Sequence, residues 1–327
     1  MDYIISWLYL EEKGNESSYM QVNAKSTSKK FQNVYWECVV SFYYASLQKN
    51  PAAKHIFYTN AQELPIIQGF CVASFFENND IEIKKQELTN KTPMNWHNAW
   101  RNQFYVFDIL KDLSTVVEKN DAILILDSDC IIKNSLEPLF TIIKDKGLIS
   151  YLIGYDLEHN INGISTNNMR KLYKCFYNED KDVFYYGGEF IGIKGGNLDT
   201  LLREYQLLWA KNYKLYEEKK LKLNEEAHFL SMLYHNMNLA NNLGNQYIKR
   251  MWNGLNYNNL KKEDCGLSIY HLPAQKTTGF HYFFNKFVKK NKKFNQQDII
   301  NIFDISNKKS QRRKAREIVT KLIFKYR

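Results

Sequence analysis

The segment AILILDSDCIIK, residues 122–133, constrains the fold more than any other part of the sequence. Its first five residues are all apolar, and a short apolar run of this kind is typical of a buried strand. The run ends directly at Asp127 and Asp129, two like charges that repel each other. The sequence therefore predicts a buried strand with a pair of carboxylates at its end, an arrangement that calls for a cation.

Strand and helix patterns alternate along the rest of the chain. Strands are predicted at residues 2–10, 55–60, 81–83 and 183–194, the last interrupted at Gly187 and Gly188, and helices at 31–48, 98–113, 198–213 and from 224 onward. This alternation is typical of an α/β fold with a mostly parallel sheet flanked by helices. Ligands of such sheets bind at the carboxyl ends of the strands, which is where the acid pair lies.

The composition indicates one globular body without a disulfide framework. The chain has 327 residues, 44% of them hydrophobic, and its five cysteines are an odd number without a Cys-x-x-Cys pair. A reducing, cytoplasmic location is expected. The apolar run at the start breaks at Glu11, and no segment reaches the roughly 18 apolar residues of a membrane span, so neither a signal sequence nor a span is predicted.

The acid pair favours a divalent metal ion. Residues i and i+2 of an extended chain project to the same side, so the two carboxylates can meet at one point. A few oxygen ligands suit Mg²⁺ or Mn²⁺, which keep positions for substrate phosphates. Two other interpretations stay open: acids that only cap the next helix, and a phosphotransferase or phosphatase. That last class places Thr where this chain has Ile131, and the second Asp-x-Asp, Asp180 to Asp182, is interpreted as a solvated loop.

Four motifs together resemble the nucleotide-sugar-dependent glycosyltransferases of the GT-A fold. They are ILILDSDCIIKNSLEPLF, YYGGEFIGIK, NEEAHFLSML and YHLPAQK, which follow one another in the family's order within residues 1–282. The likeness is greatest to the retaining branch that includes bacterial lipooligosaccharide galactosyltransferases and glycogenin. It also covers the predicted helix that carries Arg101.

The resemblance implies roles for specific residues. Asp127 and Asp129 would bind Mn²⁺ or Mg²⁺ with His271 as the third ligand, and Lys276 would contact the diphosphate of a nucleotide-sugar donor, expected to be a UDP-sugar. Ser128 and Arg101 are further candidates for contact with the donor. Two departures concern the loop from His271 to Lys276, which is one residue shorter than the family pattern and lacks its Pro-Trp, and the Asn-x-Gly strand, which here reads Gly-Gly-Glu.

Three further acids are candidates for the catalytic chemistry. Glycosyl transfer needs groups that stabilise positive charge at the anomeric carbon. Glu189 lies beside the glycine pair, and Glu225 and Glu226 lie at a predicted helix start, where carboxylates are also ordinary partners of the helix dipole. A base on the acceptor hydroxyl would give inversion, and its absence favours retention, so both courses stay open.

The end of the sequence is strongly basic. From residue 283 onward there are 14 Lys and Arg against three acids, whereas the net charge of the whole chain is +10. Aromatic and aliphatic residues are interleaved with these charges, and a last helix is predicted near 309–325. The sequence thus predicts a glycosyltransferase domain at 1–282 and a basic amphipathic tail at 283–327 that binds an anionic membrane surface.

The tail indicates where such an enzyme would work. An acceptor that is a glycan or a lipid-linked glycan, in cell-surface polysaccharide synthesis, would place the protein on the inner face of the plasma membrane. A non-enzymatic nucleic-acid-binding protein is the alternative, but no nucleic-acid-binding fold motif is present in the sequence, so no nucleic-acid partner is expected. A merely solubilising end is the third interpretation.

Overall fold

The computed structural model describes residues 1–305 except 15, 18, 20, 23, 255 and 256, and beyond them residues 315, 318, 319 and 322. The chain forms two compact units. Unit 1 comprises Met1–Tyr3, Gln86–Ile125 and Leu139–Asn245. Unit 2 comprises Ile4–Lys85, Leu126–Pro138 and Gln246–Arg327.

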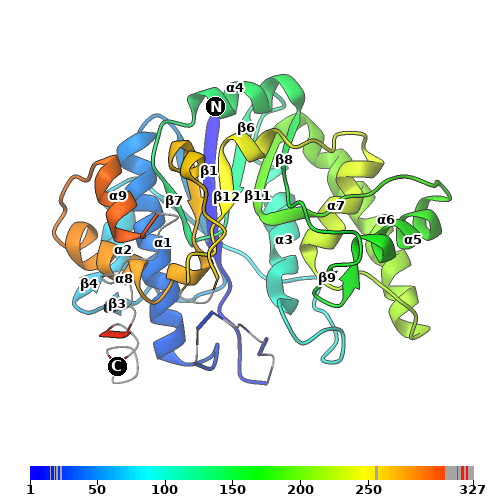
Figure 1. The fold of residues 1–327 in the computed structure, drawn as a ribbon, viewed down its shortest axis with the longest axis horizontal. Coiled ribbons are helices and arrows are strands. Elements are labelled where there is room, and N and C mark those ends of the chain that lie inside the picture. Colours follow the sequence, from blue (N-terminus) through cyan, green and yellow to red (C-terminus); the bar gives the residue numbers. More distant parts are fainter. Residues whose placement is uncertain are drawn as a thin grey trace. The chain divides into compact units, whose positions relative to one another are not determined.

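Both units contain strands and helices (Figure 1). Unit 2 holds β1 (Asp2–Leu8), α1 (Lys29–Lys49), β2 (Lys54–Thr59), β3 (Ile66–Ile67), β4 (Phe70–Cys71), α2 (Val72–Glu77), β5 (Glu82–Lys85), β7 (Cys130–Ile132), β12 (Ile248–Arg250), β13 (Ile269–His271), α8 (Gly279–Phe283) and α9 (Gln296–Ile302). Unit 1 holds α3 (Tyr105–Leu113), β6 (Ala122–Leu126), α4 (Glu137–Lys146), β8 (Leu148–Leu152), β9 (Asn160–Ile161), β10 (Ile164–Ser165), α5 (Thr166–Tyr177), β11 (Tyr186–Lys194), α6 (Leu198–Glu217) and α7 (Glu226–Asn236).

The main sheet confirms the predicted fold class. Its strands follow the order β5-β2-β1 within unit 2 and β6-β11-β8 within unit 1. β2 and β5 are parallel, with Ile56 opposite Glu82, whereas β11 and β8 are antiparallel. The fold is therefore a mixed α/β fold with a mostly parallel sheet flanked by helices.

Most predicted elements lie within a few residues of their observed bounds, and two differ in form. The strand at residues 183–194 is not interrupted, because β11 runs through Gly187 and Gly188, but its register with β8 shifts between Tyr186 and Ile191. The helix expected from residue 98 begins as a short 3₁₀ helix, η1 (Arg101–Phe104), that continues into α3.

Helix α1 forms the core of unit 2. Ser28 caps its start by accepting a hydrogen bond from the backbone N–H of Phe31. Most of its side chains from Val34 to Ser46 are buried, and the helix packs against β7 and α8. This position places one face of α1 beside the turn that carries the aspartates. None of the helices within the described residues has the length and apolar character that crossing a membrane requires.

The segment that follows residue 279 packs within unit 2 on both sides of residue 283, the boundary predicted from the sequence. α8 continues into a π-helical turn, η6 (Phe284–Val288), and both pack on α1 (Figure 1). Phe284, Phe287 and Phe294 are buried, so these aromatic side chains cover the protein core instead of facing a lipid surface. The helix predicted near 309–325 lies almost entirely outside the described residues.

Candidate metal and nucleotide site

A tight turn carries the two aspartates from β6 to β7. The backbone N–H of Cys130 donates to the carbonyl oxygen of Asp127 at 3.1 Å, which closes a four-residue turn over residues 127–130. The extended geometry expected for this segment is therefore wrong, although the two carboxylates still meet. Ser128, between them, is buried.

His271 reaches the acid pair through a small sheet of unit 2. Its strands follow the order β12-β13-β7, and the antiparallel pairing of β13 with β7 sets His271 opposite Cys130. The backbone N–H of Leu272 also donates to the carbonyl oxygen of Asp129 at 3.0 Å. The pairing of β13 with β7 thus places the imidazole of His271, which is distant in the sequence, beside the turn that carries the aspartates.

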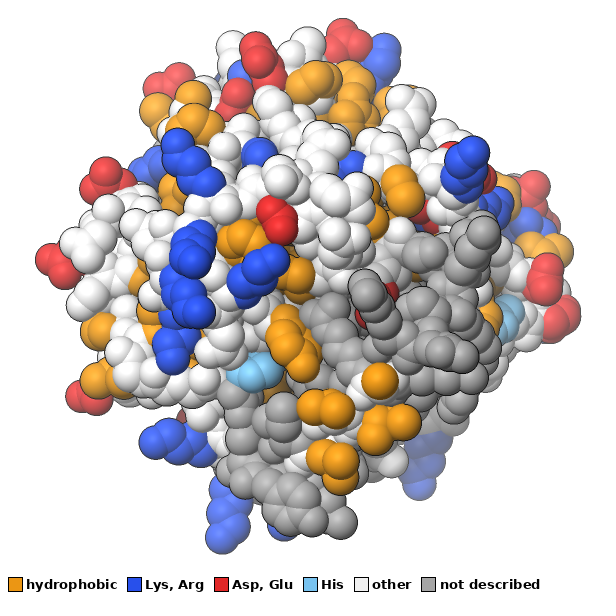
Figure 2. Space-filling view, turned by 60° about the vertical axis from the view of Figure 1, so that its left-hand side comes forward, with side chains coloured by type: hydrophobic (Ala, Val, Ile, Leu, Met, Phe, Trp, Pro, Cys, Tyr) orange, Lys and Arg blue, Asp and Glu red, His pale blue; other side chains and the backbone are white. Residues whose placement is uncertain are grey.

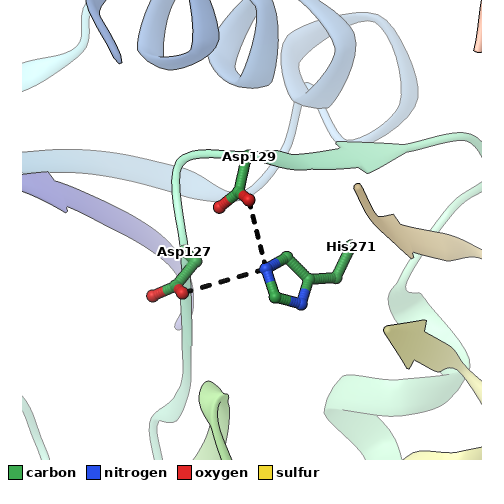
Figure 3. Close-up of side chains that lie close together, drawn as sticks. All are labelled: Asp127, Asp129 and His271. Carbon is green, nitrogen blue, oxygen red and sulfur yellow. Dashed lines mark ion pairs between the residues drawn. The ribbon is translucent and has the colours of Figure 1, made fainter. Parts of the chain in front are cut away.

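The three side chains converge on one point (Figure 3). His271 Nε2 lies 3.2 Å from Asp129 Oδ2 and 4.0 Å from Asp127 Oδ2, and one ligand atom of each residue lies within 4.8 Å of the others. Octahedral ligands at about 2.1 Å from a metal ion are about 3.0 Å apart when adjacent and about 4.2 Å apart when opposite. Both distances from His271 Nε2 fall within the range for a single divalent ion. Two carboxylates with one imidazole suit Mn²⁺.

Lys276 lies on the same carboxylate. A short 3₁₀ helix, η5 (Pro273–Gln275), follows His271 and turns the chain back, so that Lys276 Nζ donates to Asp129 Oδ2. The side chains of Lys276 and Asp129 are 6% and 4% exposed, which makes this a buried ion pair. The shorter loop of this chain still delivers a lysine to the acid pair.

The charge state of Asp129 follows from these neighbours. Burial raises the pKa of its carboxyl group, but the Lys276 ammonium and then His271 more than offset burial and hold that pKa well below its ordinary value. Asp129 is therefore an anion at neutral pH. A carboxylate that is already ionised can bind a metal ion without first releasing a proton.

Helix α1 lines the site with residues that sequence reasoning missed. Tyr35 and Cys38 are three residues apart and so share one helix face. Lys276 Nζ lies 5.4 Å from the centre of the Tyr35 ring. Burial, followed by the charges of Asp129 and its neighbours, raises the pKa of the Tyr35 hydroxyl well above its ordinary value. No motif marks Tyr35, because its place depends on how α1 packs against β7.

Two of the three candidate acids lie against the glycine pair of β11 in unit 1. A Cβ atom on Gly187 would meet Glu189 Oε2 at 2.3 Å, and one on Gly188 would meet Glu226 Oε1 at 2.5 Å. The missing side chains therefore make room for two carboxylates at the irregular part of the strand. Glu189 is buried and Glu226 is half-buried.

Glu225 is held differently. Its Oε1 accepts a hydrogen bond from the Tyr185 hydroxyl at 2.9 Å, its Oε2 accepts from Asn162 Nδ2, and His228 Nε2 lies 3.5 Å from it. With its oxygens engaged and its side chain buried, Glu225 links α7 to β11 and to the β9–β10 turn. The geometry therefore favours a structural role for Glu225.

Arg101, a candidate for contact with the donor, is buried in unit 1. It is the first residue of η1, is 4% exposed, and its Nη1 donates to Met94 Sδ at 3.3 Å. Trp100, the preceding residue, has φ 58°, a conformation that most side chains avoid.

Comparison with known proteins gives two similar solved structures. Neither a protein-family model nor a curated protein matches the chain. The galactosyltransferase LgtC, in complex with donor and acceptor sugar analogues, has 12% sequence identity and a TM-score of 0.45 over 97% of this chain and 100% of its own. Mouse xyloside xylosyltransferase 1, in its apo form, has 10% identity and a TM-score of 0.46 over 83% of this chain and 97% of its own.

Both structures are named as glycosyltransferases, the class that the sequence motifs resemble. Their identities are low and their TM-scores are below 0.5. The function proposed below therefore rests on the residues of the site.

Proposed function

We propose that the chain is a metal-dependent glycosyltransferase that takes a sugar from a nucleotide-diphosphate donor, with a UDP-sugar as the expected donor. The observation that supports this proposal most is the convergence of Asp127, Asp129 and His271 within 4.8 Å, with Lys276 on the same carboxylate. Two carboxylates and an imidazole provide a metal site, and the adjacent ammonium provides a contact for phosphate oxygens.

Each residue of the site would then have a distinct task. Asp127, Asp129 and His271 would hold Mn²⁺ or Mg²⁺. The bound ion supplies Lewis-acid stabilisation of the negative charge that develops on the leaving diphosphate. Lys276 would bind a phosphate oxygen of the donor, and its burial strengthens that contact because few water molecules compete for its protons.

Glu189 and Glu226 are the acids that we assign to the sugar side of the reaction. Carboxylates stabilise the positive charge that develops at the anomeric carbon, and one of them can also accept the proton of the acceptor hydroxyl. Their carboxylates lie against the backbone of Gly187 and Gly188, in the space that the missing glycine side chains leave. Glu225 is left out of this role because Tyr185 and Asn162 hold it.

We also propose that unit 2 binds an anionic membrane, through a lysine patch formed by Lys286, Lys289, Lys290, Lys292 and Lys293. All five side chains are exposed, whereas the phenylalanines between and beside them are buried. Figure 2, which brings forward the side where α8 and α9 lie, shows Lys and Arg side chains gathered close together. Attraction to anionic lipid is about 1 kcal/mol per basic residue, and a lipid-linked acceptor would be reached from the inner face of the plasma membrane.

A ligand screen tests the proposed activity. The melting temperature would be measured with UDP-glucose, UDP-galactose and UDP-N-acetylglucosamine, each with and without Mn²⁺, and donor hydrolysis would be followed in parallel. We expect at least one UDP-sugar to raise the melting temperature. This increase should require Mn²⁺ and should be absent in Asp127→Asn. Mn²⁺-independent binding, or no binding of any nucleotide sugar by the wild-type protein, would contradict the proposal.

A further inference from the structure

The hydroxyl group of Tyr35 is buried beside the metal site without a hydrogen-bond partner among the described residues. Its ring is firmly held. Phe31 stacks on it with the ring centres 4.7 Å apart, and Tyr19 meets it edge-on at 6.2 Å. The orientation of the hydroxyl is therefore fixed by packing, not by a hydrogen bond.

An unpartnered buried hydroxyl group is costly and requires an explanation. The same helix shows the usual solution. Tyr43, two turns further along α1, donates to the carbonyl oxygen of Ile56 at 2.6 Å and accepts from the backbone N–H of Ser6 at 3.0 Å. Tyr35, on the same helix, has no such partner among the described residues.

The surroundings of Tyr35 specify what it could bind. The Lys276 ammonium lies 5.4 Å from its ring centre, and Asp129 and Asp127 are among the charged groups that act on its hydroxyl. A tyrosine hydroxyl carries its proton at neutral pH, so it can act as a hydrogen-bond donor. A donor next to an ammonium and a metal site is suited to an anionic oxygen of a ligand.

We propose that Tyr35 binds the donor substrate by donating its hydroxyl hydrogen to a phosphate oxygen of the diphosphate, beside Lys276. This inference rests on the proposed function and adds a residue from α1 to the same site. It explains the missing partner, because the partner arrives with the ligand. The ring contact also keeps the Lys276 ammonium near the Tyr35 side chain, so that both could bind the same diphosphate.

The substitution Tyr35→Phe tests this role, with Tyr43→Phe as the matched control on the same helix. Isothermal titration calorimetry would measure Mn²⁺ alone and then UDP, ADP and GDP in the presence of Mn²⁺. We expect Tyr35→Phe to weaken binding of the preferred nucleoside diphosphate about tenfold, because a hydrogen bond to a charged group is lost, and to leave Mn²⁺ affinity unchanged. The ligand-free melting temperature should stay the same or rise, because a buried unpartnered hydroxyl group is removed.

The control should behave in the opposite way. Tyr43→Phe removes two satisfied hydrogen bonds, so it should lower the melting temperature and leave nucleoside diphosphate affinity unchanged. If Tyr35→Phe binds the diphosphate as tightly as the wild-type protein does, the inference is overturned while the proposed function stands. If the wild-type protein binds no nucleoside diphosphate with Mn²⁺, the proposed function fails and the inference fails with it.

Discussion

His271 Nε2 lies 3.2 Å from Asp129 Oδ2, and Lys276 Nζ donates to that same oxygen. One carboxylate oxygen thus contacts both the imidazole at the end of β13 and an ammonium from the segment that follows this strand. The pairing of β13 with β7 fixes the imidazole, and the 3₁₀ helix η5 returns the lysine. A metal ion held by Asp127, Asp129 and His271 would therefore compete with the Lys276 ammonium for Asp129 Oδ2.

The two aspartates should differ in their effect on stability. Asp127→Asn and Asp129→Asn should both abolish Mn²⁺ binding, because each removes a ligand charge. Asp129→Asn should also lower the free energy of unfolding by about 3 kcal/mol, because it leaves the buried Lys276 without its counter-ion. The Asp127 side chain is 29% exposed, so Asp127→Asn should cost less than about 1 kcal/mol. Urea unfolding followed by circular dichroism checks both values, and equal losses would contradict the assigned ion pair.

Lys276→Met should change metal and nucleotide binding in opposite directions. Without nucleotide, removal of the competing ammonium should tighten Mn²⁺ binding about tenfold, because the metal no longer displaces a buried ion pair. With Mn²⁺ present, UDP binding should weaken about tenfold or more, because a charged contact to phosphate is lost. Electron paramagnetic resonance measures free Mn²⁺ in the first titration, and calorimetry measures UDP in the second. Weaker Mn²⁺ binding in the variant would show that Lys276 supports the metal site instead of competing for it.

The parts of the site that lie close together in the sequence could be predicted from it. The strand at residues 122–126 has the expected bounds, and Asp127 and Asp129 follow it directly. The local hydrophobic pattern identifies the strand, and the chain direction places the two aspartates at its carboxyl end. In α/β sheets, ligands bind at the carboxyl ends of the strands. The resemblance to a family supplied His271 and Lys276, which no local pattern marks.

The remaining features depend on contacts between distant segments. The register that sets His271 opposite Cys130 is a property of two short strands, and strands of three residues carry little pattern. The buried position of Arg101 follows from packing within unit 1, and the place of Tyr35 follows from the packing of α1 on β7. The phenylalanines after residue 283 could not be placed from the sequence either. An amphipathic segment has the same sequence pattern whether its apolar side chains face a membrane or the protein core.

The three candidate acids should separate into two groups. Glu189→Gln and Glu226→Gln should lower the turnover number about a hundredfold or more and leave Mn²⁺-dependent UDP binding unchanged, because they act on the sugar and not on the diphosphate. Glu225→Gln should mainly reduce stability, by about 1–3 kcal/mol, because it weakens the hydrogen bonds to Tyr185 and Asn162. Donor hydrolysis rates and thermal unfolding of the three variants test this. Full turnover in both Glu189→Gln and Glu226→Gln would exclude the two acids from the chemistry.

Buried histidines should make the protein lose stability below neutral pH. Burial lowers the pKa of His55 to about 4, and its Nε2 lies 2.7 Å from Ser46 Oγ. The unfolded chain binds a proton to this histidine near pH 6.5, so stability is complete above that pH and decreases as the pH falls toward 4. The loss is about 3 kcal/mol for His55, and buried His228, with a pKa lowered to about 3, adds to it. His55→Gln should flatten the pH dependence of the unfolding free energy between pH 6.5 and 4, and an unchanged slope would contradict the assignment.

The lysine patch should decide whether the protein binds an anionic membrane. Lys290, Lys292 and Lys293 are exposed, and replacement of all three by Gln removes about 1 kcal/mol of attraction per residue. We therefore expect roughly a hundredfold weaker binding to vesicles of 30% phosphatidylserine, while hydrolysis of a soluble UDP-sugar stays unchanged. Sedimentation with vesicles at about 0.1 M salt measures the binding, and higher salt should weaken it further.

A control variant separates position from net charge. Lys214, Lys219 and Lys220 are exposed at the end of α6, in unit 1, and their replacement by Gln changes the net charge by the same amount. If the patch specifies the membrane contact, this control should sediment with vesicles as the wild-type protein does. Equal losses in the two variants would indicate a general charge effect, and equal retention in both would exclude the patch as the site of membrane binding. Elution of both proteins from a DNA column would also be compared. If the patch variant elutes at the same salt concentration as the wild-type protein, these lysines do not bind nucleic acid.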